Sequence, residues 1–212
     1  MPMRHLSHDQ HHDLCISHPT SACTECRMSG TLMCRYKPID LAGFLLGFLP
    51  FGTATFVGLL QGGYGWYLLG WLAYWLFFFF GWEARILCSH CPFWAEGGRV
   101  LHCHANYGVY KIWRFHPEPM RTLEKAQFML GSAVFIGYPF VFLLLGKQYG
   151  MTLVAAAAAI GAGFTLKRHA CSRCINFSCP LNSVPKTIVD AYLKLNPAMR
   201  EAWEASGYRL GE

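Results

Sequence analysis

The chain has 212 residues, of which 53% are hydrophobic and 14% are charged, and its formal net charge is +6 at pH 7. Soluble domains carry about 25% charged residues, so this composition excludes an ordinary soluble enzyme or binding domain. The charge is also segregated, because Lys147 is the only Asp, Glu, Lys or Arg within 41–82 and 127–166. The sequence therefore predicts an all-α membrane protein in which apolar spans alternate with polar segments.

Residues 1–40 form the first predicted segment, which is polar, rich in histidine and without the apolar stretch of a secretory signal peptide. Its four cysteines have the spacing C-x7-C-x2-C-x7-C: Cys15, Cys23, Cys26 and Cys34. Four thiols this close can surround one zinc ion or one iron–sulfur cluster. We predict a metal site here, because metal binding would order a segment that has little apolar core. The alternative is an unstructured tail with incidental cysteines.

Residues 41–82 are predicted to form a first transmembrane hairpin. Two apolar runs, 41–60 and 64–82, contain 20 and 19 residues and are joined by a very short connector. A helix needs roughly 20 apolar residues to cross a bilayer. A soluble hairpin is disfavoured, because runs without a charged face leave no surface for water. Gly43 and Gly47 form a G-x-x-x-G pattern, which predicts a face for close helix packing.

The next segment, 83–126, is predicted to be a loop that binds metal. Cys88 and Cys91 form a C-x2-C pair, and His102, Cys103 and His104 follow further along the loop. These residues supply a shell of three cysteines, with or without one histidine. No C-x2-C pair in the chain is followed directly by histidine, which argues against covalently bound c-type haem.

Residues 127–166 are predicted to form a second transmembrane hairpin, with runs of 20 residues (127–146) and 18 residues (149–166). The four runs contain no histidine, which argues against haem held by two histidines within the bilayer. They also contain no acidic or basic side chain, so they offer no obvious path for protons or ions. Any chemistry is therefore expected in the polar segments.

The last segment, 167–212, contains a third group of cysteines, Cys171, Cys174 and Cys179, followed by a proline. The group locally resembles the ferredoxin-type iron–sulfur motif C-x2-C-x2-C-x3-C-P, which has one cysteine more. A fourth ligand must come from elsewhere. Either this segment shares one cluster with the loop 83–126, or two three-thiol clusters are each completed by another residue. After Pro185, apolar residues recur at helical spacing and predict an amphipathic helix.

Two R-x-x-C-S-x-C stretches, 85–91 and 168–174, begin 83 residues apart, and each follows the second run of a hairpin. The first run of each hairpin also contains a Pro-Phe pair, at Pro50 and at Pro139. We infer a duplicated unit of hairpin and cysteine loop. Two such units would form a four-helix bundle with a pseudo-twofold axis, which would bring the two C-x2-C loops together.

The distribution of basic residues predicts the orientation in the membrane. Seventeen of the 18 Lys and Arg residues lie outside the spans and the hairpin tips, in the segments that contain every cysteine. The positive-inside rule therefore places both termini and the central loop in the cytoplasm, in a multi-pass protein of the cytoplasmic membrane. Thiols there are kept reduced, which disfavours disulfides. Anionic lipid accounts for the positive charge, so we predict no nucleic-acid partner.

These features predict an integral membrane metalloprotein that binds one or more iron–sulfur clusters for electron transfer. It would act as a subunit of a membrane redox complex, with protein partners, rather than as an independent enzyme, and no catalytic residues are predicted. Thiolates also bind zinc, so a zinc-stabilised membrane scaffold is the main alternative. Metal trafficking is another. A thiol oxidoreductase ranks last, because no thioredoxin-like pattern surrounds the C-x2-C pairs.

Overall fold

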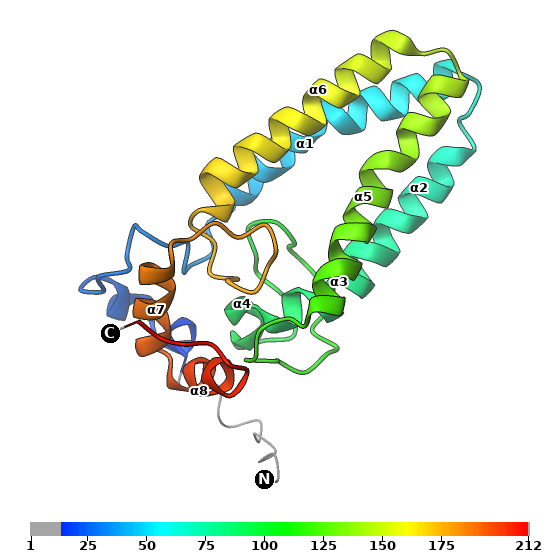
Figure 1. Cartoon of the computed structure of the whole chain (residues 1–212). Helices are drawn as coiled ribbons and strands as arrows, with labels where there is room; N and C mark the ends of the chain where they lie inside the picture. Colours follow the sequence, from blue (N-terminus) through cyan, green and yellow to red (C-terminus); the bar gives the residue numbers. More distant parts are fainter. Residues whose placement is uncertain (1–13, 212) are drawn as a thin grey trace.

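The computed structural model describes residues 14–211. This part of the chain is helical and contains no strand, only isolated β-bridges between Ser29 and Leu32 and between Val100 and Tyr110. Long helices extend from one end of the molecule, where the shorter helices and the loops gather into a body that we call the cap (Figure 1). The all-helical prediction is therefore confirmed for the described residues.

Three helices are long and apolar enough to cross a membrane: α1 (Pro38–Gln61), α5 (Thr122–Leu145), and α6 (Tyr149–Thr165) with its π-helical continuation η6 (Leu166–Cys171). Pro38 lies in the first turn of α1, where its missing N–H group costs no hydrogen bond. Most side chains in these spans face outward rather than into the protein. This arrangement suits a lipid environment, because lipid can solvate apolar side chains that water cannot.

The remaining predicted span, 64–82, is less regular. Residues 67–86 are helical in three consecutive pieces, α2 (Tyr67–Trp75), the π-helical η4 (Leu76–Trp82) and α3 (Glu83–Ile86). The irregularity coincides with four successive phenylalanines, 77–80, and π-helical turns widen the backbone locally. Among the described helices only the three above satisfy the length and composition of a span, so four crossings stay a prediction.

The helix α1 packs along α6 and the helix α2 lies beside α5 (Figure 1), and α5 also contacts both α1 and α6. Glycines permit close contacts, because a side chain at Gly58 or Gly131 would collide with Leu143 or Phe78, respectively. The predicted G-x-x-x-G face was wrong in its position. A Cβ atom at Gly43 or at Gly47 would meet nothing within 4 Å.

The two hairpin tips have the same backbone structure. Both α1 and α5 end in a Schellman motif, in which the N–H groups of Tyr64 and Gln148 donate to carbonyls five residues earlier, each at 2.9 Å. The motif needs a left-handed residue after the helix, and Gly63 (φ 82°) and Lys147 (φ 54°) occupy this position. The two hairpin tips also touch each other, since a Cβ atom on Gly146 would lie 2.9 Å from the Cα of Gly62.

The cap contains all three cysteine-rich segments. Its helical elements are η2 (Cys15–Ser17), η3 (Thr20–Cys23), α3, η5 (Cys88–His90), α4 (Pro92–Ala95), α7 (Lys186–Lys194) and α8 (Pro197–Ala205). Residues from all three segments share one apolar core, which includes Leu14, Phe93 and Leu193. The predicted amphipathic helix corresponds to α7, which begins directly after Pro185 and packs into this core. The cap is therefore one body at one end of the helices, opposite the hairpin tips (Figure 1).

Candidate functional site

The N-terminal thiols, which are those of Cys15, Cys23, Cys26 and Cys34, lie close to one another. Burial raises the pKa of the Cys34 thiol to about 12, and the nearby thiols of the other three cysteines contribute to this increase. Arg35 holds the segment in a loop, because its guanidinium donates to the carbonyls of Ile16 at 2.7 Å and His18 at 2.5 Å. Its Nε atom also donates to the sulfur of Cys23 at 3.4 Å.

A second group, the cap thiols, combines cysteines of the central loop and of the C-terminal segment: Cys88, Cys91, Cys103, Cys171, Cys174 and Cys179. Burial raises the pKa of Cys91 well above its usual value, and the thiols of Cys103, Cys174 and Cys179 raise it further. Burial likewise raises the pKa of Cys174, with contributions from Cys103, Cys179 and Cys171. Charges shift a pKa in this way only at short range. The two segments therefore bring their thiols to one place.

The C-x2-C pairs of the central loop (Cys88 and Cys91) and of the C-terminal segment (Cys171 and Cys174) are presented by similar turns at the ends of helices. Ser89 Oγ donates to the carbonyl of Arg85 at 2.5 Å, and Ser172 Oγ donates to that of Arg168 at 2.7 Å. Each serine thus satisfies a carbonyl that the ending helix leaves without an N–H partner. The shared serine of the two R-x-x-C-S-x-C stretches has this structural role.

Neither group of thiols forms a closed coordination shell. Within 14–211, no three His, Cys, Asp or Glu side chains are arranged to hold a metal ion, and all ten cysteines are free thiols. Metal ligands must converge to about 2.3 Å from the metal and lose their protons, and binding is commonly coupled to local ordering. Ligation by these cysteines therefore stays a prediction.

The two histidines predicted as possible ligands lie near carboxylates. His102 Nδ1 lies 3.6 Å from a carboxylate oxygen of Glu96, and His104 Nδ1 lies 3.6 Å from one of Asp40. The ring of Tyr36 packs against both imidazoles. Ligation by these histidines, like that by the cysteines, stays a prediction.

Glu83 is a buried acid beside the cap thiols that sequence reasoning missed. It is 8% exposed, and its Oε2 atom has no hydrogen-bond partner among the described residues. Burial raises its pKa to about 8. Burial is the largest cause that raises the pKa values of the Cys88, Cys103 and Cys179 thiols, and the negative charge of the Glu83 carboxylate raises them further. Its position, directly after the apolar run 64–82, was the available signal.

Tyr192 lies between the two groups of thiols and was also missed. Its side chain is 1% exposed, and its hydroxyl has no conventional hydrogen-bond partner in the described chain. Burial raises its pKa well above the usual value, and the thiols of Cys15, Cys34 and Cys91 raise it further. The Tyr192 side chain is therefore near both the N-terminal thiols and the cap thiols. Its place on the apolar face of α7 had suggested packing alone.

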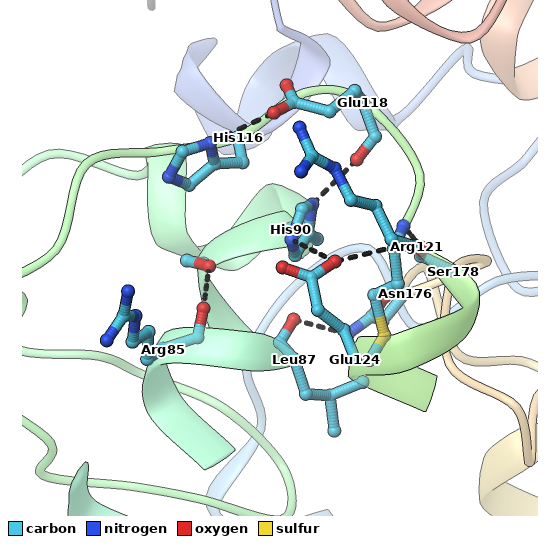
Figure 2. Close-up of polar contacts among 11 residues, drawn as sticks. Arg85, Leu87, His90, His116, Glu118, Arg121, Glu124, Asn176 and Ser178 are labelled. Carbon is cyan, nitrogen blue, oxygen red and sulfur yellow. Dashed lines mark hydrogen bonds and ion pairs between the residues drawn. The ribbon is translucent and has the colours of Figure 1, made fainter. Parts of the chain in front are cut away.

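A polar pocket adjoins the C-x2-C pair of the central loop, Cys88 and Cys91, and Figure 2 shows side chains of its walls. Its volume is about 220 Å³, and its walls are Arg85, His90, His116, Glu118, Pro119, Arg121 and Glu124. His90, between Cys88 and Cys91 in the sequence, donates through Nδ1 to the carbonyl of Glu118 at 2.7 Å. The pocket is thus connected directly to the turn that carries the two thiols.

Further hydrogen bonds fix the walls of this pocket. The N–H group of Arg121 donates to Glu124 Oε2 at 2.7 Å, which caps the start of α5. The N–H group of Met120 donates to the hydroxyl of Ser178, and the amide of Asn176 donates to the carbonyl of Leu87 at 3.2 Å. The C-terminal cysteine segment therefore supports the pocket from behind (Figure 2).

Comparison of the chain with protein-family models, with curated proteins and with solved structures finds no match. The function must therefore be argued from the thiols, the buried acid and the pocket themselves.

Proposed function

We propose that this chain is an integral membrane metalloprotein that holds one or more iron–sulfur clusters on its cap thiols and transfers electrons. It would act as a subunit of a membrane redox complex, between a soluble electron donor and a membrane partner. The chain itself would supply the metal site and the membrane anchor rather than a separate catalytic centre.

The observation that carries this proposal is the gathering of six thiols from two distant segments. Soft thiolates are the preferred ligands of iron–sulfur clusters and of zinc. Burial disfavours the thiolate in the metal-free protein, as the raised pKa values of Cys91 and Cys174 indicate, and a bound cation would reverse this preference. Of the two arrangements that the sequence left open, the shared neighbourhood favours a cluster shared between the segments.

The single cap supports four membrane crossings. The cap contains residues that precede α1, residues between α3 and α5, and residues that follow η6. If α1, α5 and α6 cross the bilayer, the chain between α1 and α5 must also return through it. The pieces α2 and η4 run in that direction (Figure 1). The positive-inside rule would then place the cap in the cytoplasm, where its thiols stay reduced.

Structural details also support the proposed duplication. The two Schellman tips lie 84 residues apart, the two serine hydrogen bonds lie 83 residues apart, and α2 and α6 each continue directly into a π-helical segment, η4 and η6. Gly62 and Gly146, which occupy equivalent positions, touch each other, as residues on a twofold axis do. The Pro-Phe pairs are 89 residues apart, so they do not share this register and do not support the repeat.

The decisive experiment is metal analysis of protein purified without oxygen. We expect a brown sample that contains iron and acid-labile sulfide and loses its visible absorption when dithionite is added. A colourless protein with stoichiometric zinc would replace this proposal with the zinc-stabilised scaffold. Zinc confined to the N-terminal thiols, beside an iron–sulfur cluster on the cap thiols, would be consistent with it.

A further inference from the structure

The polar pocket continues into a second pocket of more apolar character. The second pocket also has a volume of about 220 Å³ and adds Trp82, Ile86, Leu123 and Gln127 to walls that both pockets share. Leu123 is 68% exposed in the first turn of α5, which is a candidate membrane span. The combined site therefore runs from the turn that carries Cys88 and Cys91 to the surface where α5 enters the proposed bilayer.

The size of this site suits a head group with an attached chain. Pockets for drug-sized molecules measure roughly 300–1,000 Å³, so neither pocket alone accommodates a large ligand. A compact polar ring would occupy the inner pocket, and an apolar tail would leave past Leu123 along the outside of α5. Tryptophan is typical of membrane interfaces, and the rings of Trp82 and Trp113 both lie close to the Arg85 guanidinium.

The two arginines of the site are its free hydrogen-bond donors. Both glutamates already have histidine partners, because Glu118 Oε1 lies 3.0 Å from His116 Nδ1 and Glu124 Oε2 lies 3.6 Å from His90 Nε2, and Glu124 also caps the start of α5. Neither Arg85 nor Arg121 forms an ion pair within the described part of the chain. The Arg85 guanidinium instead lies over the rings of Trp82, at 5.9 Å, and Trp113, at 5.2 Å. With its histidines neutral, the formal charges of the pocket sum to zero, and the acceptor oxygens of a neutral ring would gain donors from the two arginines.

We propose that these two pockets bind the head group of a quinone, with its carbonyl oxygens accepting hydrogen bonds from Arg85 and Arg121. The ring would lie beside Trp82, and the isoprenoid chain would extend into the lipid. The choice of a quinone among neutral amphiphiles rests on the proposed electron-transfer function. His90 places the pocket next to Cys88 and Cys91, so a ligand bound there would lie close to the proposed cluster and could exchange electrons with it. The quinone would be the membrane partner of that function.

The test is isothermal titration calorimetry of the full chain in detergent with ubiquinone-1, a soluble short-chain quinone. We expect saturable binding at one site. Arg85→Met keeps the long side chain but removes the donor, and Arg121→Met removes the second donor. Each should weaken binding about tenfold or more. Arg168→Met is the matched control, since it changes the same position of the second R-x-x-C-S-x-C stretch, is also exposed, and lines neither pocket. It should bind like the unmodified chain.

The titration is performed on metal-free protein as well as on metal-loaded protein, so that it is independent of the metal analysis. Binding that depends on Arg85 supports the quinone site even if the protein holds no iron. The inference is overturned if ubiquinone-1 does not saturate, or if Arg85→Met and Arg168→Met behave alike. It is also overturned if short-chain phosphatidylglycerol binds more tightly than ubiquinone-1, because the site would then recognise an anionic lipid.

Discussion

At the scale of single residues, Glu83 connects the membrane helices to the cap thiols. Its carboxyl group is buried without a hydrogen-bond partner on Oε2, and burial raises its pKa from 4.5 to about 8. The fold therefore favours the neutral acid. Because the folded-state pKa is the higher one, the stabilisation is complete below about pH 4.5 and is lost as the pH rises through 8.

We accordingly expect metal-free protein to become less stable between pH 5 and pH 8.5, by an amount on the order of a few kcal/mol. Glu83→Gln is neutral at every pH and should remove this part of the decline. The measurement is the thermal unfolding midpoint in chelator and reductant, with exposed Glu201→Gln as a control that should keep the decline. Equal slopes for the unmodified chain and Glu83→Gln would contradict the assignment.

Tyr192 is expected to tune metal binding rather than to stabilise the cap. Its buried hydroxyl lies near Cys15, where it can donate to a thiolate that ligates metal. Hydrogen bonds to metal ligands typically change metal affinity 10–100-fold. Tyr192→Phe should therefore weaken metal binding at the N-terminal thiols about tenfold, as measured by competition with a chelator. Its effect on the stability of metal-free protein should be small, because the hydroxyl interacts there only with the thiol of Cys15, which is a weak hydrogen-bonding group.

Tyr208 offers the opposite case and serves as the control. Its hydroxyl donates to Asp190 Oδ1 at 2.7 Å, and no cysteine is among the groups that shift its pKa. Tyr208→Phe should lower the stability of the metal-free cap by about 1 kcal/mol and leave metal affinity unchanged. If both variants change affinity alike, Tyr192 acts only through the packing of α7.

At the scale of elements, the two C-x2-C turns should behave as parts of one site. Cys91→Ser in the central loop and Cys174→Ser after η6 should each abolish the same visible absorption and the same iron content. Cys23→Ser, among the N-terminal thiols, should leave both unchanged, because that group is separate from the cap thiols. Iron per protein and electron paramagnetic resonance of the reduced samples are the measurements. Loss of half the iron in each cap-thiol variant would indicate two separate clusters instead.

Helix pairing shows why some elements could be predicted from sequence and others could not. The spans of α1, α5 and α6 follow from local composition, because crossing a bilayer needs only length and apolarity. Close packing depends on which helices meet. Gly58 and Gly131 lie in tight contact with side chains of other helices, although Gly43 and Gly47 have the recognisable pattern. A local pattern cannot identify a partner helix, so the packing face was misplaced.

At the scale of the whole molecule, the same distinction applies to the candidate site. Cysteine spacing predicted which residues group within each segment, and the repeated stretches suggested that two segments meet. The burial of Glu83 and the polar pocket arise only when α3 and the start of α5 pack together, and the place of Tyr192 arises only when α7 packs into the cap core. Their residues are far apart in the chain and belong to no spacing pattern. Non-local contacts of this kind account for the part of the site that sequence could not predict.

The topology of the molecule gives a last test, which separates four crossings from three. Truncated chains fused to green fluorescent protein or to alkaline phosphatase report the cytoplasmic or the outer side in a bacterial host. A fusion after Lys147 should give phosphatase activity, because this residue lies at the second hairpin tip, and a fusion after residue 212 should fluoresce. The informative position is Met120, in the cap just before α5. If α2 and η4 return the chain through the bilayer, a fusion there should fluoresce. Phosphatase activity at Met120 would place the central loop on the outer side, which the packing of all three cysteine-rich segments into one cap does not allow.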